Sequence, residues 1–188
     1  MIDAQLLQSC IKKERKGQYL LYKQYFSFLM SVCIRYKKDE EEARAVLNMG
    51  FLKILNNIGK YPTHIPFEAW IRRIMINTII DEYRKYKKEK ETFTYTNFEE
   101  IDYYNDHINL NQADLHFDAE DLKVFIKELP PLGQKVFNLF AIDGYSHKEI
   151  SKMLEISVSA SKWHVSNSRK VLKQKIRQSM ITGLKKRV

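Results

Sequence analysis

The chain has 188 residues, of which 44% are hydrophobic and 12% aromatic, so disorder along its whole length is excluded. It holds only six Gly and four Pro, and its apolar residues recur mostly at helical spacing, which predicts an all-α protein without a strand-rich domain. The formal net charge of +9 favours a nucleic acid as partner, although an anionic membrane surface would attract it too. Because no apolar run could cross a membrane and no signal peptide is visible, we expect a cytoplasmic protein without membrane insertion.

Residues with catalytic or metal-binding chemistry are sparse and scattered. Cys10 and Cys33 lie singly in apolar helical contexts, and the five His form no ligand pair. We therefore predict two buried thiols, no metal site and no cofactor. The chain also lacks an HxxxH motif, paired acids for a metal, a nucleophile with a base and a Gly-rich phosphate loop, so an enzyme is disfavoured.

Four helices are predicted in the first ninety residues. A short amphipathic helix within residues 3–13 is predicted to end or bend at Gly17, and a very apolar helix over residues 18–37 is predicted to be central in a bundle. Four acids at residues 39–42 mark the start of a third helix, where the macrodipole favours them. This helix carries more apolar residues than one buried face requires. Either core packing or contact with another protein explains Leu47, Asn48, Phe51 and Leu55.

A loop with Gly and two Pro, residues 59–66, precedes a long fourth helix over residues 67–90 that ends in a basic run. The loop presents Tyr61, which is expected either as an exposed functional aromatic or as a staple that packs over Phe67 or Trp70. From Thr92 to Asp121 the chain holds acids but no Lys or Arg and shows no clear period, which predicts a flexible acidic linker. The predicted division is a first domain (1–91), the linker (92–121), a second four-helix domain (122–180) and a basic tail (181–188).

Residues 146–176 have the pattern of a helix-turn-helix. Ser146 and Glu149 form a predicted capping box for the first helix, and Ser157 is predicted to cap the second. The positions predicted to pack inward in the second helix are Val158, Ser161, Val165, Ser168, Leu172 and Ile176.

The opposite side of that second helix is basic, and no acid occurs from Ile156 to the end of the chain. It carries Ser159, Lys162, Trp163, His164, Asn167, Arg169, Lys170 and Lys173. The first part of this face has donors suited to base edges, and the later Arg and Lys suit phosphates. Trp163 is expected either to meet a base or to fold back onto its own domain.

Two stretches resemble the extracytoplasmic-function group of bacterial sigma factors. FEAWIRRIMINTIIDEYRK, residues 67–85, looks like the promoter-melting helix of the family, and LPPLGQKVFNLFAIDGYSHKEISKMLEIS, residues 129–157, resembles the opening of its terminal helix-turn-helix. The order and spacing of the two are specific. The sequence departs from the family pattern around Glu42–Phe51 and in the recognition helix, where Lys162 is kept but Trp163 and His164 are unusual.

The resemblance implies a non-enzymatic initiation factor that binds RNA polymerase core and promoter DNA, with an anti-sigma factor as a further candidate partner. It implies contact with the clamp of the large polymerase subunit through Leu47, Asn48, Phe51 and Leu55. For the downstream promoter element and strand opening it implies Lys53, Tyr61, Arg73, Asn77, Asp81 and Arg84. For the upstream element it implies Ser159, Lys162, Trp163, His164, Asn167, Arg169 and Lys170. The alternative is a two-domain helix-turn-helix regulator that does not replace a sigma subunit, and co-purification with core polymerase separates the two.

Overall fold

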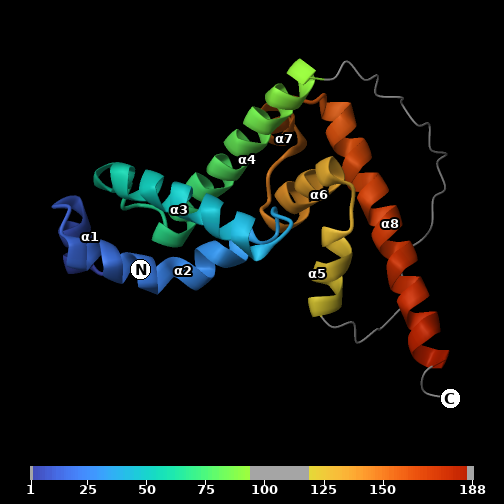
Figure 1. Cartoon of the computed structure of the whole chain (residues 1–188), viewed down its shortest axis with the longest axis horizontal. Coiled ribbons are helices and arrows are strands. Elements are labelled where there is room, and N and C mark those ends of the chain that lie inside the picture. Colours follow the sequence, from blue (N-terminus) through green and yellow to red (C-terminus); the bar gives the residue numbers. More distant parts are fainter. Residues whose placement is uncertain (1, 94–118, 186–188) are drawn as a thin grey trace.

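The computed structural model describes residues 2–93 and 119–185, and every regular element within these ranges is a helix, as predicted (Figure 1). The N-terminal half contains α1 (Ala4–Ile11), α2 (Arg15–Cys33), α3 (Glu40–Asn57), a 3₁₀ turn (Ile58–Lys60) and α4 (Phe67–Phe93). The C-terminal half contains α5 (Ala119–Lys127), α6 (Pro131–Phe137), a π-helix (Asn138–Ile142), α7 (His147–Leu154) and α8 (Val158–Lys185). Most of the predicted linker lies outside the described residues.

Helix α2 contacts α1, α3 and α4, but it buries only one face: Tyr19 and Leu20 are 63% and 44% exposed, so the predicted central place is only partly met. The acids lie at the start of α3 as predicted, and the Asp39 carboxylate also caps the helix by accepting a hydrogen bond from the Glu42 amide at 2.9 Å. The largest side chains that are fully buried in this domain are Leu21, Leu29, Leu47, Ile54, Phe67, Ile71, Met75, Ile76, Ile79 and Ile80. These residues come from three helices, so the core forms only when α2, α3 and α4 are assembled.

Gly17 does not end the first helix, and that prediction is wrong. The chain turns earlier, at Lys13, whose φ of 60° is left-handed, and Gly17 lies inside α2. A Cβ at Gly17 would lie 2.2 Å from Oγ and 2.7 Å from Cβ of Ser9. The glycine is therefore needed for the close approach of α1 to α2.

Gly17→Ala is expected to lower the free energy of unfolding by about 2 kcal/mol. The new methyl group meets Ser9 at its Cβ and backbone, which costs about 3 kcal/mol of overpacking, and the better helix propensity of Ala offsets about 1 kcal/mol of this. Gly59→Ala is the matched control, because its Cβ would have no neighbour within 4 Å. Urea unfolding followed by circular dichroism should separate the two variants, and equal midpoints would contradict the close approach.

The second domain has the predicted four helical segments, with α5, α6 and α7 all contacting α8. After Phe137 the helical chain changes from the α-helix α6 to a π-helix. Here the Asp143 amide donates to the Asn138 carbonyl, five residues back, at 2.9 Å. This wider turn places Asn138 and Asp143 on the same side of the chain.

The helix-turn-helix is formed by α7 and α8, and its local predictions are confirmed. Ser146 and Glu149 make the reciprocal capping box, and the Ser157 hydroxyl accepts from the Ala160 amide at 2.9 Å. Glu155 ends α7 in the left-handed conformation, with φ of 55°, and this residue turns the chain toward α8.

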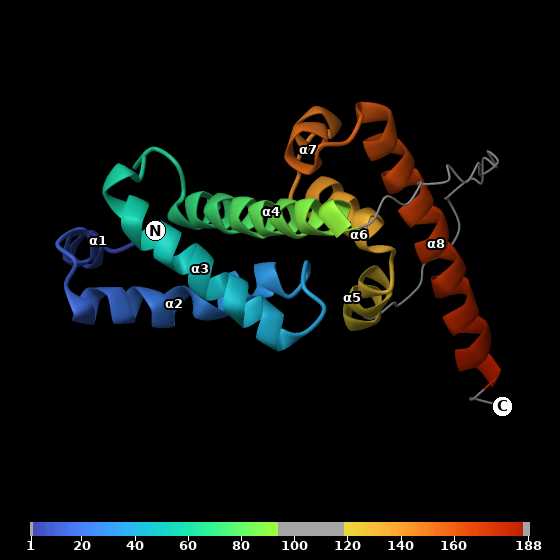
Figure 2. The same cartoon turned by 45° about the horizontal axis from the view of Figure 1, so that its top comes forward.

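The two domains pack against each other in this conformation. Figures 1 and 2 show α7 beside the C-terminal part of α4, and these two helices are in contact. A single cluster of buried side chains runs from the first domain into Val136, Leu139, Ile150 and Leu154 of the second. The packing of the domains therefore decides which parts of α4 are accessible.

Candidate nucleic-acid and polymerase interfaces

The polar residues predicted to meet the downstream element form one stripe on α4. Arg73, Asn77, Asp81 and Arg84 are spaced by four, four and three residues, so they span about 80° of the helix surface. The ammonium of Lys53, on α3, donates to the Asp81 carboxylate at 3.1 Å and so joins the stripe. An exposed ion pair contributes only about 0–1 kcal/mol, so this pair can be exchanged for a contact with DNA at little cost.

Tyr61 is half-buried against α4 and is not the freely exposed aromatic of the first expectation. Its hydroxyl donates to the Ile65 carbonyl at 2.6 Å, and its ring lies 5.1 Å from that of Phe67 and 5.3 Å from that of Trp70. The packing of the alternative expectation, in which Tyr61 fastens the loop to the fourth helix, is observed, and a role of Tyr61 in strand opening stays a prediction. The sequence could not distinguish these two expectations. The loop folds back on itself through the hydrogen bond from Tyr61 to Ile65, which no sequence pattern indicates.

Arg84, at the end of the α4 stripe, contacts the second domain in this conformation. Its Nη2 donates to the Lys152 carbonyl at 2.6 Å, and its Nε lies 3.6 Å from Oε1 of Glu155. Both partners belong to the helix-turn-helix, 68 residues away along the chain for Lys152. No signal in the sequence pairs residues at this separation.

The candidate polymerase residues on α3 fall on two different sides of the helix. Leu47 is completely buried, and Phe51 is 8% exposed with its ring 4.9 Å from that of Tyr22. Core packing, the alternative to direct contact, therefore accounts for Leu47 and Phe51. Asn48 is exposed and accepts from the Tyr22 hydroxyl at 3.1 Å, whereas Leu55 is half-buried.

Two exposed apolar side chains on α3 were missed by the sequence analysis. Leu52 is 59% exposed and Met49 is 44% exposed, and both lie beside Asn48 on the outer side of the helix. The spacing of Asn48, Leu52 and Leu55, four and three residues, is the signal for a second face. This spacing could not be recognised in the sequence, because apolar residues occur on every side of α3 and the sequence did not define which face points inward.

The inward face of α8 matches the prediction except at its two ends, and at the far end Ile176 is only half-buried. Ser161, Val165, Ser168 and Leu172 are all buried. Val158, which was predicted to pack inward, is 40% exposed. As the first residue of α8 it lies next to the turn, before the helix reaches its neighbours.

The outward face of α8 presents the predicted recognition residues to solvent. Ser159, Lys162, Trp163, Arg169 and Lys170 are exposed. Arg169 also packs within its own domain, because its guanidinium carbon lies 5.8 Å from the ring centroid of Phe140. Lys162 and Lys170 are therefore the better probes of what this face binds.

His164 and Asn167 are only half-exposed, so the middle of the predicted recognition face is less accessible to solvent than expected. The His164 ring meets Trp163 edge to face, with 4.9 Å between ring centroids. Partial burial lowers the pKa of His164, which leaves the imidazole neutral at pH 7. His164 therefore adds no positive charge to this face of α8.

Cys10 and Cys33 are buried thiols that form no disulfide, and burial raises the pKa of Cys33 to about 12. Across residues 2–93 and 119–185 no three His, Cys, Asp or Glu side chains are grouped to hold a metal ion. Within the same part of the chain, none of the helices is both long and apolar enough to span a bilayer.

Comparison with protein families gives two matches, one in each domain. Residues 21–89 match sigma-70 region 2, and residues 119–172 match sigma-70 region 4. The first contains α3 and the polar stripe of α4, and the second contains the helix-turn-helix. Together the two matches cover more than half of the chain.

Individual relatives support the same assignment over most of the length. The chain is 29% identical to RNA polymerase sigma factor SigZ of Bacillus subtilis, over 82% of this chain and 84% of the relative. It is 24% identical to RNA polymerase sigma factor YlaC of the same species, over 89% and 96%. The fold resembles that of the sigma factor RpoE from Bartonella quintana, solved with the anti-sigma factor NepR, at a TM-score of 0.50 and 16% identity, over 85% of this chain and 96% of that one. The chain belongs to the sigma-70 family, as a two-region transcription initiation factor of the extracytoplasmic-function type.

Proposed function

We propose that this sigma factor binds RNA polymerase core through α3, reads the upstream promoter element with α8, and opens the downstream element with the polar stripe of α4. The observation that carries the proposal is that the two candidate DNA surfaces lie on separate domains, each within its own sigma-70 region. Two DNA contacts on one chain act at a raised effective concentration, so a correctly spaced pair of elements binds more tightly than either alone.

The proposed domain limits are residues 1–91 for polymerase binding and melting, 92–121 for an acidic linker, 122–180 for upstream recognition and 181–188 for a basic tail. Support comes from the ends of the helices, since α4 ends at Phe93 and α5 begins at Ala119. Both helices extend slightly beyond the proposed limits. Helix α8 continues to Lys185, so the proposed tail begins as helix.

The polymerase-binding face is proposed to consist of Asn48, Met49, Leu52 and Leu55, with the clamp of the large subunit as its target. Leu52 and Met49 are among the exposed large hydrophobic side chains, and exposed apolar residues on one helix face are typical of protein contacts. Leu47 and Phe51 support this face from inside the core.

Three broader features complete the proposal. The factor acts in the cytoplasm, where polymerase and promoters are, and it has no catalytic activity of its own. An anti-sigma factor is proposed as a regulator, because the structural relative from Bartonella quintana was solved with one.

Run-off transcription by core polymerase on fragments of the source genome, with and without this protein, tests the proposal. We expect new transcripts with defined start sites only when the protein is added, and co-purification of the protein with core polymerase. Folded protein that binds DNA but neither joins the polymerase nor yields transcripts would instead identify a helix-turn-helix regulator.

A further inference from the structure

A side-chain hydrogen bond joins the starts of the two helices of the helix-turn-helix. Nδ1 of His147, the first residue of α7, lies 3.0 Å from the hydroxyl oxygen of Ser161, near the start of α8. Ser161 is 0% exposed, whereas His147 is half-buried. Among the residues that the structure describes, His147 is the side chain that bonds this hydroxyl. A buried polar group of α8 therefore depends on α7 for its partner.

The bond is compatible with every protonation state of His147. A serine hydroxyl can both donate and accept, so it pairs with Nδ1 whether or not this nitrogen carries a proton. The imidazole ring is held in place by Phe140 of the π-helix, whose ring is stacked on it with 4.4 Å between centroids and 14° between planes. Three segments of the second domain thus meet at His147.

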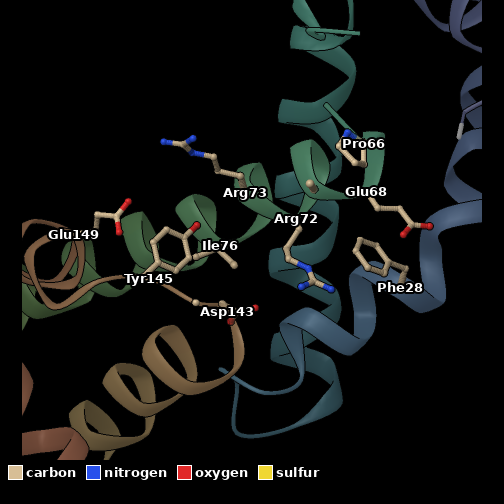
Figure 3. Close-up of a pocket in the computed structure, with 11 residues that line it drawn as sticks. Phe28, Pro66, Glu68, Arg72, Arg73, Ile76, Asp143, Tyr145 and Glu149 are labelled. Atoms are coloured by element: carbon tan, nitrogen blue, oxygen red, sulfur yellow. The ribbon is translucent and has the colours of Figure 1, made fainter. Parts of the chain in front are cut away.

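The side chains on either side of His147 are turned toward the first domain. Tyr145 and Glu149 line a cavity of about 530 Å³ that the second domain shares with α4 (Figure 3). Glu149 also accepts hydrogen bonds from the amide and the hydroxyl of Ser146. At this end of α7, the polar contact with α8 therefore comes from His147.

The Ser161 hydroxyl has an alternative partner in its own helix. A buried hydroxyl without a hydrogen bond is costly, and a serine inside a helix can donate to the carbonyl oxygen four residues back, which often bends the helix. For Ser161 this is the carbonyl of Ser157, which already accepts from the Ser161 amide at 3.0 Å. Because a carbonyl oxygen has two lone pairs, the competing bond can form. The contact with His147 keeps the hydroxyl away from that carbonyl.

A bend at this point would affect the part of α8 that is proposed to read bases. Ser159 and Lys162 are exposed there, and Lys162 follows Ser161 directly in the chain. A hydrogen bond to a base edge weakens steeply when donor and acceptor are misaligned. Attraction between a lysine and a phosphate depends much less on angle. Bending the start of α8 should therefore reduce discrimination between sequences more than it reduces general affinity for DNA.

We propose that His147 is a positioning residue for the upstream reader: by bonding the Ser161 hydroxyl, it keeps the start of α8 straight and holds Lys162 where it meets base edges. This proposal rests on the proposed function for the assignment of α8 to the upstream element. The role requires no contact between His147 and DNA, because it acts through Ser161.

His147→Phe is the principal test, because it keeps an aromatic ring for the stack on Phe140 and removes the nitrogen that bonds Ser161. The ratio of affinities for the upstream element and for random duplex DNA should fall by about 5-fold, a coupling typical of residues in contact. Fluorescence anisotropy measures both affinities on duplexes of equal length. The upstream element is taken from a promoter whose start site is mapped by run-off transcription.

Ser161→Ala should restore discrimination to the His147→Phe variant. The double variant has neither the nitrogen nor the hydroxyl, so no group is left to bond the Ser157 carbonyl, and replacing both partners by apolar groups is nearly neutral. Ser168→Ala is the matched control for this second change. Ser168 is also buried in α8, at 2% exposure, but its hydroxyl lies 3.4 Å from the Gly133 carbonyl. Added to His147→Phe, Ser168→Ala should restore nothing.

Rescue by Ser161→Ala and not by Ser168→Ala would support the proposal. Unchanged discrimination in folded His147→Phe would overturn it, and so would a loss that Ser161→Ala does not restore. If His147→Phe does not fold, His147→Asn and His147→Leu decide, because their side chains have nearly the same shape and only Asn can bond Ser161. The Asn variant should then discriminate better than the Leu variant, and equal ratios would overturn the proposal.

A measurement without DNA separates failure of this inference from failure of the proposed function. Residual dipolar couplings of the amides of residues 158–162, compared with those of residues 165–172, report a bend at the start of α8. His147→Phe should introduce a bend that Ser161→Ala removes. If the unmodified protein prefers no upstream element, the proposed function fails, while the couplings still test the positioning by His147. If the couplings show no bend although the unmodified protein reads its promoter, the positioning role fails alone.

Discussion

Leu47→Ala is expected to destabilise the first domain by about 2–5 kcal/mol, because it removes a completely buried leucine from the junction of three helices. A small domain has about 5–15 kcal/mol of stability in total, so the variant loses a large part of it. Loss of polymerase binding by this variant would then reflect a damaged core. Urea unfolding followed by circular dichroism measures the effect.

Leu52→Ala is the control that separates core from contact surface. Leu52 is 59% exposed on the same helix, so its removal should change stability by no more than about 0.5 kcal/mol. If α3 binds the polymerase clamp, this variant should nevertheless bind core polymerase more weakly. A folded Leu52→Ala protein with undiminished affinity for polymerase would place the docking surface elsewhere.

Lys162→Ala is expected to weaken discrimination at the upstream element by about 1–3 kcal/mol, or about 5- to 150-fold in affinity. Lys162 lies in the second turn of α8, is exposed, and belongs to the N-terminal part of the recognition helix that reaches base edges in this motif. Fluorescence anisotropy on the cognate element and on random duplex DNA of equal length gives the ratio of affinities. The loss should occur on the cognate element.

Lys170→Ala is the matched variant for a backbone contact. It removes the same side chain eight residues further along α8, where the helix has passed the base edges. Binding to cognate and random DNA should weaken by the same factor, and the slope of log affinity against log salt should fall by about one. Equal behaviour of the two lysine variants would remove the base-reading role from Lys162.

Much of this protein follows from local sequence. The capping box at Ser146, the acidic start of α3 and the apolar spacing of α7 and α8 act over one or two helical turns, so they could be interpreted without a structure. The two sigma-region motifs could be identified for the same reason, because each is a nearly continuous stretch. The all-α class, the helix-turn-helix and the family were therefore determined by the sequence alone.

Two kinds of feature could be determined only from the tertiary structure. One is the face that a helix turns inward, and the other is a contact between residues distant in the sequence. Leu47 and Leu52 have the same side chain and lie five residues apart, yet only the packing of α3 on its neighbours shows that one is buried and the other exposed. The same holds for Gly17, whose role is defined by Ser9 on another helix.

The contact between domains is the clearest case. Arg35 and Asp143 are 108 positions apart, and no local pattern in the sequence marks either as the partner of the other. Their pairing requires the end of α2, the π-helix and the docking of α7 on α4 at the same time. Local propensity defines helices, but their relative placement is decided by burial and long-range hydrogen bonds, and only the folded chain brings those together.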